Sequence, residues 1–445
     1  MASLQTRITY LKSLPAVRER SQKVFEKAKA NQLHHFEVNF PKLDNAVDLV
    51  ISLIRRDYAD LSSIPPHSRW RHFDVGGHSR VQRLIDSWES SGKLEITRRI
   101  LDLFVVSVLL DAGAGNAWSY REKETGQIYK RSEGLAIASL DMFNAGLFSS
   151  DKSQPHRVDA RKLVDITVDD VAKAFQVNET TNPLDGLEGR ANLLSRLGKS
   201  LDNHPEFFKS DDKSAPRPGN LVDYLLAHPT TKSSSIVQID TLWSVIIDGL
   251  SDVWPPTRTS LGGVSLGDVW PCDVLKSSSK DSQGDDDANE HLVPFHKLSQ
   301  WLTHSLMEPM TKILDIKFEG IKNLTGLPEY RNGGLFVDTG LLTLKEPDRA
   351  RGISYFKQNY RESNDDTEIV PLFEASDPVI VEWRAMTVIL LDKVAEKIRE
   401  ILAENLTLAQ VLEAGTWKAG REIAQKLRPK TKGPPIAIKS DGTVF

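Results

Sequence analysis

An acidic side chain in an apolar setting is the first candidate for chemistry in this chain. The run EYRNGGLFVDTGLLTLK, residues 329–345, places Asp338 between apolar residues, with a Gly-Gly pair before it and Gly340 after it. A carboxylate in such a place either caps a helix or is kept partly dry for catalysis. The glycines would let the backbone approach another group closely.

A second cluster combines an aromatic ring with basic side chains. SRWRHFDVGGHSR, residues 68–80, places Trp70, Arg71 and His72 ahead of a Gly-Gly turn. The segment is either a surface turn anchored by Trp70 or a loop that binds an anion or a planar ring.

A third cluster follows a strongly apolar segment. DAGAGNAWSY, residues 111–120, brings Asp111, Asn116, Trp118 and Tyr120 together with small residues. Small residues let a backbone come close to a neighbour, and the aromatic rings could stack on a planar ligand. A packed turn is the alternative.

Two predicted helix starts carry polar residues suited to an anion. Ser132 and Glu133 open one helix, whose free amides suit a phosphate or a carboxylate; alternatively, the two residues only cap it. His296 and Lys297 stand early in another, where the helix dipole disfavours cations. That penalty indicates either an anionic partner or a solvated pair.

Other motifs fail on spacing. The GKS at 198–200 lacks the glycine that a phosphate-binding loop needs, and we expect a helix C-terminus there. The GAG at 113–115 lacks the third glycine of a dinucleotide fingerprint. The pairs His34-His35 and His72…His78 have no evident coordinating geometry, so no metal and no cofactor are expected. Cys272 is the single cysteine, which excludes an intramolecular disulfide and fits a reducing compartment.

Composition narrows the class of protein. The chain has 445 residues, of which 40% are hydrophobic and 27% charged, as in ordinary globular proteins. Its net charge of -4 argues against a nucleic-acid partner. No apolar run approaches the roughly 20 residues of a membrane span, and the N-terminal stretch lacks the apolar core of a secretory signal. A cytoplasmic location without membrane contact is expected.

Helical periodicity dominates the chain. Apolar residues recur at intervals of three and four in most long segments, which predicts a mainly α protein. The predicted helices cover residues 17–32, 45–58, 94–113, 132–148, 166–176, 187–201, 239–250, 295–314 and 381–402. Residues 117–121 and 127–131 could pair as a hairpin, and the C-terminal PPIAIKSDGTVF could form another.

No loop separates regions of different composition, so one helical unit over residues 1–445 is expected. Polar loops are predicted at 209–220, 276–290 and 361–377. The unit is described in four parts: an N-terminal helical part (1–90), a central helical part with the hairpin (91–275), a mobile polar loop (276–292) and a C-terminal part with the candidate acids (293–445).

The order of these clusters resembles the fungal and bacterial uracil-catabolism protein family, formerly a domain of unknown function. The similar segments are DAGAGNAWSYREKETGQIYKRSEGLAIASLDMFNAGLF, VDITVDDVAKAF, EGRANLLSRLGKSL, EYRNGGLFVDTGLL and VIVEWRAMT. The resemblance covers essentially the whole chain. It associates the chain with uracil degradation through ribosylurea.

A more distant similarity is to the queuosine-salvage nucleotide N-glycosidases. That family implies an all-helical fold like that of helix-hairpin-helix DNA glycosylases, and cleavage of a nucleotide's glycosidic bond. The positions that match its motifs are Asn116 with Trp118, Tyr129, ITVDDV, Glu188 with Arg190, Phe295-His296-Lys297 with Gln300, and Phe336-Val337-Asp338. In that family a Tyr-Arg pair follows the aspartate, whereas here Tyr330-Arg331 follows Glu329 and precedes Asp338. Both Asp338 and Glu329 therefore remain candidate catalytic acids.

The resemblance implies an N-glycosidase of ribosylurea, its 5′-phosphate or a related uracil nucleotide derivative. Such cleavage passes through an oxocarbenium-like state that a carboxylate stabilises. The substrate-binding candidates are Asn116, Trp118, Tyr120, Ser132, Glu133, Tyr330, Arg331, Phe336, Trp70, Arg71 and His72, and the phosphate-binding candidates are His296, Lys297 and Arg384. The alternative is a non-catalytic protein that binds and channels a ribosylated intermediate, with other uracil-catabolism enzymes as partners.

Overall fold

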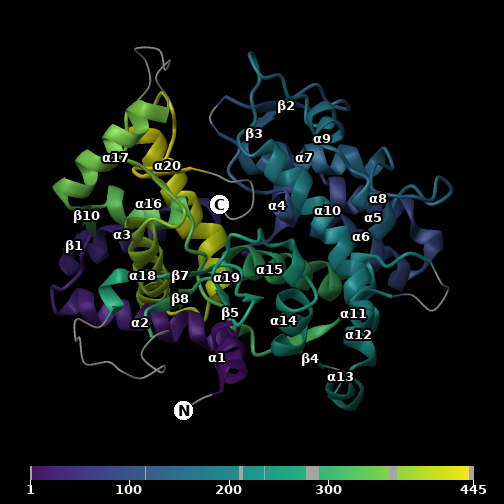
Figure 1. Cartoon of the computed structure of the whole chain (residues 1–445), viewed down its shortest axis with the longest axis horizontal. Coiled ribbons are helices and arrows are strands. Elements are labelled where there is room, and N and C mark those ends of the chain that lie inside the picture. Colours follow the sequence, from purple (N-terminus) through teal and green to yellow (C-terminus); the bar gives the residue numbers. More distant parts are fainter. Residues whose placement is uncertain are drawn as a thin grey trace. The chain divides into compact units, whose positions relative to one another are not determined.

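The computed structural model describes residues 3–115, 117–209, 214–234, 236–276, 290–359 and 368–439. Helices dominate these ranges and the strands form short pairs, which confirms the predicted mainly α fold class (Figure 1). The likeness to helix-hairpin-helix DNA glycosylases stays a prediction. None of the described helices is long and apolar enough to cross a membrane.

The chain forms two compact units, each assembled from segments that are distant in sequence. Unit 1 contains the described residues of Met1–His67, Arg258–Lys297 and Lys322–Lys439, and unit 2 contains those of Ser68–Thr257 and Leu298–Ile321. The single unit with contiguous parts stays a prediction. Most of the loop predicted to be mobile, 276–292, lies outside the described residues.

Unit 1 is built around one long buried helix, α18 (Pro378–Leu402), which packs along α2 (Leu14–Lys29). Asp377 caps α18 and Pro378 opens its first turn, both favourable at a helix start. The other helices of unit 1 are α1 (Leu4–Leu11), α3 (Leu43–Asp57), α16 (Tyr330–Asp338), α17 (Glu346–Asn359), α19 (Leu408–Val411) and α20 (Trp417–Leu427). Its strands are β1 (Phe36–Val38), β5 (Ser260–Leu261), β6 (Val264–Ser265), β7 (Val269–Pro271), β8 (Leu292–Pro294), β10 (Leu342–Leu344), β11 (Leu372–Glu374) and β12 (Ala437–Lys439).

Unit 2 centres on the apolar helix α6 (Lys93–Leu109), which packs against α7 (Arg131–Asn144). Nearly every side chain from Ile100 to Leu109 is buried, because α6 is apolar on all sides. The remaining helices of unit 2 are α4 (Arg69–Phe73), α5 (Arg80–Ser87), α8 (Ala160–Val164), α9 (Val168–Ala174), α10 (Leu187–Asn203), α11 (Pro205–Phe208), α12 (Leu221–Ala227), α13 (Pro229–Ser234), α14 (Ile239–Ile247) and α15 (Lys297–Leu314). The strands are β2 (Ser119–Arg121), β3 (Ile128–Lys130), β4 (Ile236–Gln238) and β9 (Lys317–Glu319).

The predicted helices and the first hairpin are confirmed within a few residues at each end. Thr167 caps α9 in a reciprocal capping box with Asp170. Strands β2 and β3 pair antiparallel, with Tyr120 opposite Tyr129.

One local expectation is wrong. Gly198 does not end a helix but lies inside α10, where a Cβ would come within 2.7 Å of the carbonyl oxygen of Ala160. The glycine therefore permits close packing against α8. The C-terminal strand β12 pairs in parallel with β11, and the second half of the predicted C-terminal hairpin, residues 440–445, lies outside the described residues.

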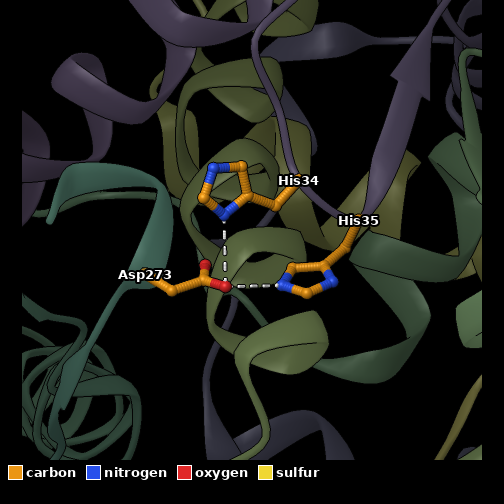
Figure 2. Close-up of side chains that lie close together, drawn as sticks. All are labelled: His34, His35 and Asp273. Carbon is orange, nitrogen blue, oxygen red and sulfur yellow. Dashed lines mark hydrogen bonds and ion pairs between the residues drawn. The ribbon is translucent and has the colours of Figure 1, made fainter. Parts of the chain in front are cut away.

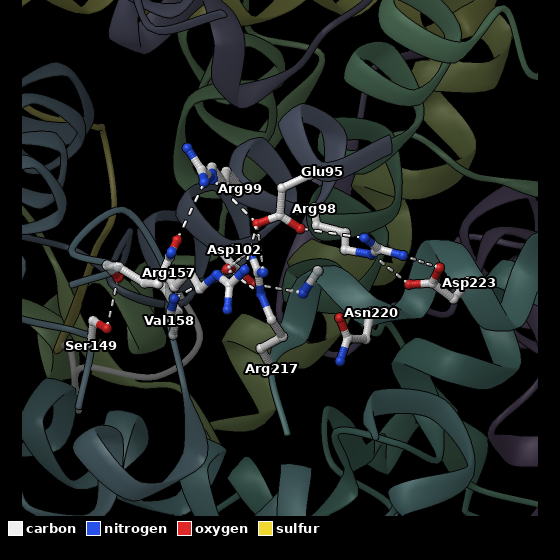
Figure 3. A network of polar contacts seen from close by, with 12 residues as sticks. Glu95, Arg98, Arg99, Asp102, Ser149, Arg157, Val158, Arg217, Asn220 and Asp223 are labelled. Carbon is white, nitrogen blue, oxygen red and sulfur yellow. Dashed lines mark hydrogen bonds and ion pairs between the residues drawn. The ribbon is translucent and has the colours of Figure 1, made fainter. Parts of the chain in front are cut away.

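A polar network fixes α6 to the segment before α12 (Figure 3). Asp102 is fully buried and accepts hydrogen bonds from Arg217 Nε at 2.9 Å and from the Gly219 amide at 2.7 Å. Burial raises the pKa of Asp102, and Arg217 opposes that effect. A side chain on Gly219 would collide with the carbonyl of Arg98, so this approach requires glycine.

Candidate functional site

A buried carboxylate with one unused oxygen lies just after α6 in unit 2. Asp111 is 8% exposed, and its Oδ2 contacts Arg69 Nη1 at 2.8 Å. Its Oδ1 is buried and has no hydrogen-bond partner among the described residues. Buried polar atoms normally have hydrogen-bond partners, so this exception indicates a ligand-binding or catalytic role.

Arg69 holds Asp111 in place, and each of its three side-chain nitrogens has a hydrogen-bond partner besides Asp111. Its Nε donates to Ser107 Oγ at 2.9 Å, its Nη2 to Ser107 O at 3.2 Å, and its Nη1 to Ser132 O at 3.2 Å. These bonds join α4, α6 and α7 at one fully buried guanidinium. Burial lowers the pKa of Arg69, whereas the charge of Asp111 raises it. Arg69 therefore positions the carboxylate rather than offering free donors.

A second buried guanidinium shapes the segment that carries Asp111. Arg190 of α10 donates from Nε to Leu110 O at 3.0 Å, and from Nη2 to Ala112 O at 2.6 Å and Gly113 O at 2.9 Å. The chain thus wraps around this side chain on both sides of Asp111. Burial lowers the pKa of Arg190 to about 10, with Asp111 opposing the shift.

The turn beyond this segment requires glycine. Gly115 has a φ of +74°, and a Cβ there would lie 2.6 Å from Oδ2 of Asp185. Both the backbone conformation and the crowding exclude other residues. The predicted Asn116 lies outside the described residues.

The aromatic candidates of this segment pack in the core of unit 2. Trp118 is 1% exposed and its indole donates to the Phe175 carbonyl at 3.0 Å. Tyr120 is equally buried, and its hydroxyl donates to Asp141 Oδ2 at 2.7 Å. Both polar atoms have hydrogen-bond partners within the protein, so these two rings act as packing residues for the segment 111–120. Their predicted contact with substrate stays a prediction.

The SRWRHF segment forms α4 and its N-cap, and its side chains contact neighbouring residues of unit 2. The indole of Trp70 donates to Asp74 at 2.9 Å, and Lys312 Nζ lies 4.2 Å from its ring centroid. Arg71 is paired with the buried Glu308 of α15. The Nδ1 atom of His72 lies 3.0 Å from Arg69 Nη1. The cluster is thus adjacent to the Arg69–Asp111 pair, and its expected anion-binding role stays a prediction.

The start of α7 reaches the same place. The carbonyl of Ser132 accepts from Arg69, and the charge of Glu133, which is 7% exposed, acts on the same guanidinium. The structure therefore brings Ser132 and Glu133 together with His72 around Arg69, although His72 comes from a different predicted cluster. Neither Ser132 nor Glu133 is the N-cap, because α7 begins at Arg131 after Lys130.

The two acids favoured by the sequence have structural partners in unit 1. Glu329 is the N-cap of α16, and its carboxylate accepts from the amides of Arg331 at 2.8 Å and Asn332 at 2.6 Å. Asp338 ends the same helix and pairs through both oxygens with Arg428. Burial raises the pKa of Asp338 and Arg428 opposes the shift. Helix capping therefore belongs to Glu329, not to Asp338.

The glycines before Asp338 serve helix packing. A Cβ on Gly333 would lie 2.8 Å from the ring of Trp383, and one on Gly334 would lie 2.9 Å from Pro435. The close approach expected at these glycines is thus made by α18 and by the C-terminal segment. Phe336 is fully buried in the same helix.

The Tyr330-Arg331 pair opens α16 directly after the Glu329 cap. Tyr330 is half-buried, and Arg331 is 4% exposed with its guanidinium 4.3 Å from the ring centroid of Trp417. This stacking couples α16 to α20. The predicted substrate contacts of both residues stay predictions.

The three phosphate-binding candidates are gathered around one buried aspartate of unit 1. Asp268 accepts from Arg384 through two bonds of 2.8 Å and from the backbone amide of Lys297 at 2.9 Å. Next to it, His296 Nε2 lies 2.8 Å from the carbonyl oxygen of Leu11. Arg384 also lies 4.1 Å from the ring centroid of Phe295. The guanidinium charge is therefore matched by Asp268, and a phosphate role stays a prediction.

A group of metal-type ligands appears where the sequence showed no coordinating geometry. His34, His35 and Asp273 of unit 1 place one ligand atom each within 4.8 Å of one another (Figure 2). Sequence reasoning missed the third member, because Asp273 lies far along the chain from the two histidines. It also left Asp111 outside the candidate acids, although its cluster had been singled out.

Comparison with known proteins places the chain in a family. A family model described as "Protein of unknown function (DUF1688)" matches residues 10–445. The chain is 44% identical over 448 residues to "Uracil catabolism protein 4" of Lachancea kluyveri, covering 98% of this chain and 99% of the relative. It is 43% identical over 445 residues to "Protein urg3" of Schizosaccharomyces pombe, with the same coverage. These matches confirm the resemblance to the uracil-catabolism protein family, and the more distant similarity to the queuosine-salvage N-glycosidases stays a prediction.

Proposed function

Because the chain belongs to the DUF1688 family, with a close relative named for uracil catabolism, we propose that it acts in that process as an N-glycosidase. Its substrate is ribosylurea, ribosylurea 5′-phosphate or a related uracil nucleotide derivative. Family membership supports a role in uracil catabolism. The proposed N-glycosidase activity rests on the candidate site, and above all on Asp111.

The observation that carries the proposal is that Oδ1 of Asp111 has no hydrogen-bond partner within the described ranges of the chain. In N-glycoside hydrolysis the bond between C1′ and nitrogen breaks, water adds to C1′, and a proton passes to the leaving nitrogen. A carboxylate oxygen held without a protein partner can stabilise the positive charge at C1′ or take the proton from that water. The fixed Oδ2–Arg69 contact orients the group for either role.

The rival acids suit this role less well. Both oxygens of Asp338 pair with Arg428, and both oxygens of Glu329 accept backbone amides. Either acid would have to give up these partners before acting on a substrate. We therefore assign the catalytic carboxylate to Asp111.

Turnover with defined substrates tests the proposal. Purified protein is incubated with ribosylurea, ribosylurea 5′-phosphate and uridine monophosphate, and release of urea or uracil is followed by chromatography. The proposal expects release from at least one substrate, with oxygen from ¹⁸O-water appearing at C1 of the ribose product. Tight binding of all three without release would contradict it and would favour a channelling protein.

A further inference from the structure

Two successive histidine rings of unit 1 meet the same carboxylate oxygen. His34 Nδ1 lies 3.2 Å and His35 Nε2 lies 3.1 Å from Oδ2 of Asp273. Figure 2 shows the two rings directed at this oxygen from the bend that precedes β1. Adjacent residues of a regular strand point to opposite faces, so the bend is what allows this arrangement.

The contact of the other ring nitrogen of His35 bears on which protonation state His35 can adopt. His35 Nδ1 lies 2.9 Å from Oδ2 of Asp348, a contact that is stabilising when the nitrogen donates its hydrogen. In neutral His35 the Nε2 lone pair then faces the lone pairs of Asp273. Two acceptors at 3.1 Å repel each other unless a cation lies between them or beside them. That cation is either a proton on the imidazole or a bound metal ion.

The residues around His34 and His35 resemble those that hold the ligands of a metal site in position. A carboxylate on the far nitrogen of a histidine ligand fixes its tautomer and ring orientation, and Asp348 occupies that position. The carboxylate of Glu382 accepts from the backbone amides of His34 and His35, both at 2.9 Å. It thereby fixes the bend that presents the two rings. The second oxygen of Asp273, Oδ1, has no hydrogen-bond partner among the described residues.

Two of the three ligand separations are close to those around a tetrahedral ion, and the third, between the two ring nitrogens, is at most 4.8 Å. Nitrogen and oxygen ligands about 2.0–2.1 Å from zinc lie about 3.3–3.4 Å apart at tetrahedral angles. The two observed separations, 3.1 and 3.2 Å, need only a small outward movement to reach this value. The side chain of His34 is 50% exposed, which leaves one side of the group open to water.

We propose that His34, His35 and Asp273 bind one divalent transition-metal ion of the zinc type. Two imidazoles and one carboxylate suit Zn²⁺ rather than Mg²⁺ or Ca²⁺, which prefer oxygen ligands alone. Water supplies the fourth ligand. The ion joins the segment before β1 to the turn at Asp273–Leu275, two parts of unit 1 that are far apart in the chain.

The test uses the full-length protein without a polyhistidine tag, stripped with a chelator and then dialysed. Zn²⁺ is titrated against a competing chelator, and Co²⁺ absorption reports the coordination number. We expect one bound ion per chain and a four-coordinate Co²⁺ spectrum. His34→Ala and Asp273→Asn should each lower the affinity at least 100-fold, and Asp348→Asn about 10- to 100-fold.

His228→Ala is the matched control, because His228 lies in unit 2 and the one described hydrogen bond of its ring is to Thr230. Circular dichroism verifies that each variant is folded. The proposal would be overturned if the titrated wild-type protein held less than 0.1 equivalent of Zn²⁺ per chain. It would also be overturned if the wild type and all variants had equal affinities for Zn²⁺. Either result would identify the group as a proton-bridged ion cluster. No arm of this test depends on glycosidase activity.

Discussion

Asp111 and Arg69 form a buried ion pair in which every side-chain nitrogen of the arginine has a described hydrogen-bond partner, whereas one oxygen of the aspartate has none. Arg69 Nη1 contacts Asp111 Oδ2 at 2.8 Å, while Oδ1 has no hydrogen-bond partner in the described part of the chain. The buried Asp102 differs from Asp111 in this respect, because it accepts from Arg217 and from the amides of Val158 and Gly219 through its two oxygens. The asymmetry at Asp111 is the structural basis of the proposed catalysis.

Replacing Arg69 by lysine should destabilise unit 2 strongly. Lysine keeps the charge but cannot bond Ser107 and Ser132 together with Asp111, and bonds from charged donors contribute about 1.5–3 kcal/mol each. We expect the free energy of unfolding to fall by about 3 kcal/mol or more in urea titrations. Arg83→Lys, at a pair with Glu124 in which both side chains are at least half exposed, is the control and should change it by less than about 0.5 kcal/mol. Equal effects would refute the role given to Arg69.

Asp338→Asn should reduce stability without removing the chemistry. Both side chains of the Asp338–Arg428 pair are nearly buried, and breaking such a pair by changing one partner costs about 3–5 kcal/mol. We expect a loss of this size in thermal or urea unfolding, with turnover per folded molecule within a factor of about 3 of the wild type. Asp44→Asn, in the exposed pair with Lys397, should leave stability almost unchanged.

Glu329→Ala should show the modest cost of a lost helix cap. Removing a capping side chain usually destabilises a protein by about 0.5–2 kcal/mol, and Glu329 accepts two amides at the start of α16. Glu329→Asp keeps a good capping residue and should recover most of this loss. The measurement is the free energy of unfolding of both variants. A loss of turnover larger than the loss of folded protein would return Glu329 to the catalytic candidates.

The ionisation of Glu95 should make the free energy of unfolding depend on pH. Burial alone would raise the pKa of Glu95, but Arg217, Arg157 and Arg99 outweigh it and hold the pKa at about 2 (Figure 3). A pKa below the unfolded value of 4.5 means that the carboxylate stabilises the fold above pH 4.5 and loses this effect as the pH falls toward 2.

The comparison of Glu95→Gln with wild type across pH measures that contribution. At pH 7 the variant should be less stable by on the order of 1–2 kcal/mol, after allowance for solvent screening. The difference should shrink steadily between pH 4.5 and pH 2. A difference that stays constant over this interval would show that Glu95 titrates normally in the folded protein.

Local features of the fold were predictable from the sequence because they depend on neighbouring residues. The apolar spacing of α18, the Thr167 cap of α9 and the β2–β3 hairpin are each set within a short stretch of chain. Gly198 was misjudged because its role depends on α8, a contact that periodicity does not encode.

The candidate site was less predictable because its partners are distant in sequence. Arg428 lies 90 residues from Asp338, so no spacing rule could show that this acid is paired. The Glu329 cap was missed because glutamate is not among the preferred N-cap residues. Asp111 stood in a recognised cluster, but only the hydrogen-bond pattern shows that its Oδ1 has no partner in the part of the chain that the structure describes.

The most direct test of the central claim compares two matched aspartate variants on the substrate that the wild type turns over. Asp111→Asn and Asp338→Asn each remove one charge from a buried aspartate–arginine pair, but of the two acids only Asp111 has an oxygen without a hydrogen-bond partner among the residues that the structure describes. The quantity measured is kcat per folded molecule, with the folded fraction taken from circular dichroism. We predict a fall of about 10²- to 10⁴-fold for Asp111→Asn and nearly wild-type turnover for Asp338→Asn. Retained turnover in Asp111→Asn, or its loss in Asp338→Asn alone, would contradict the account.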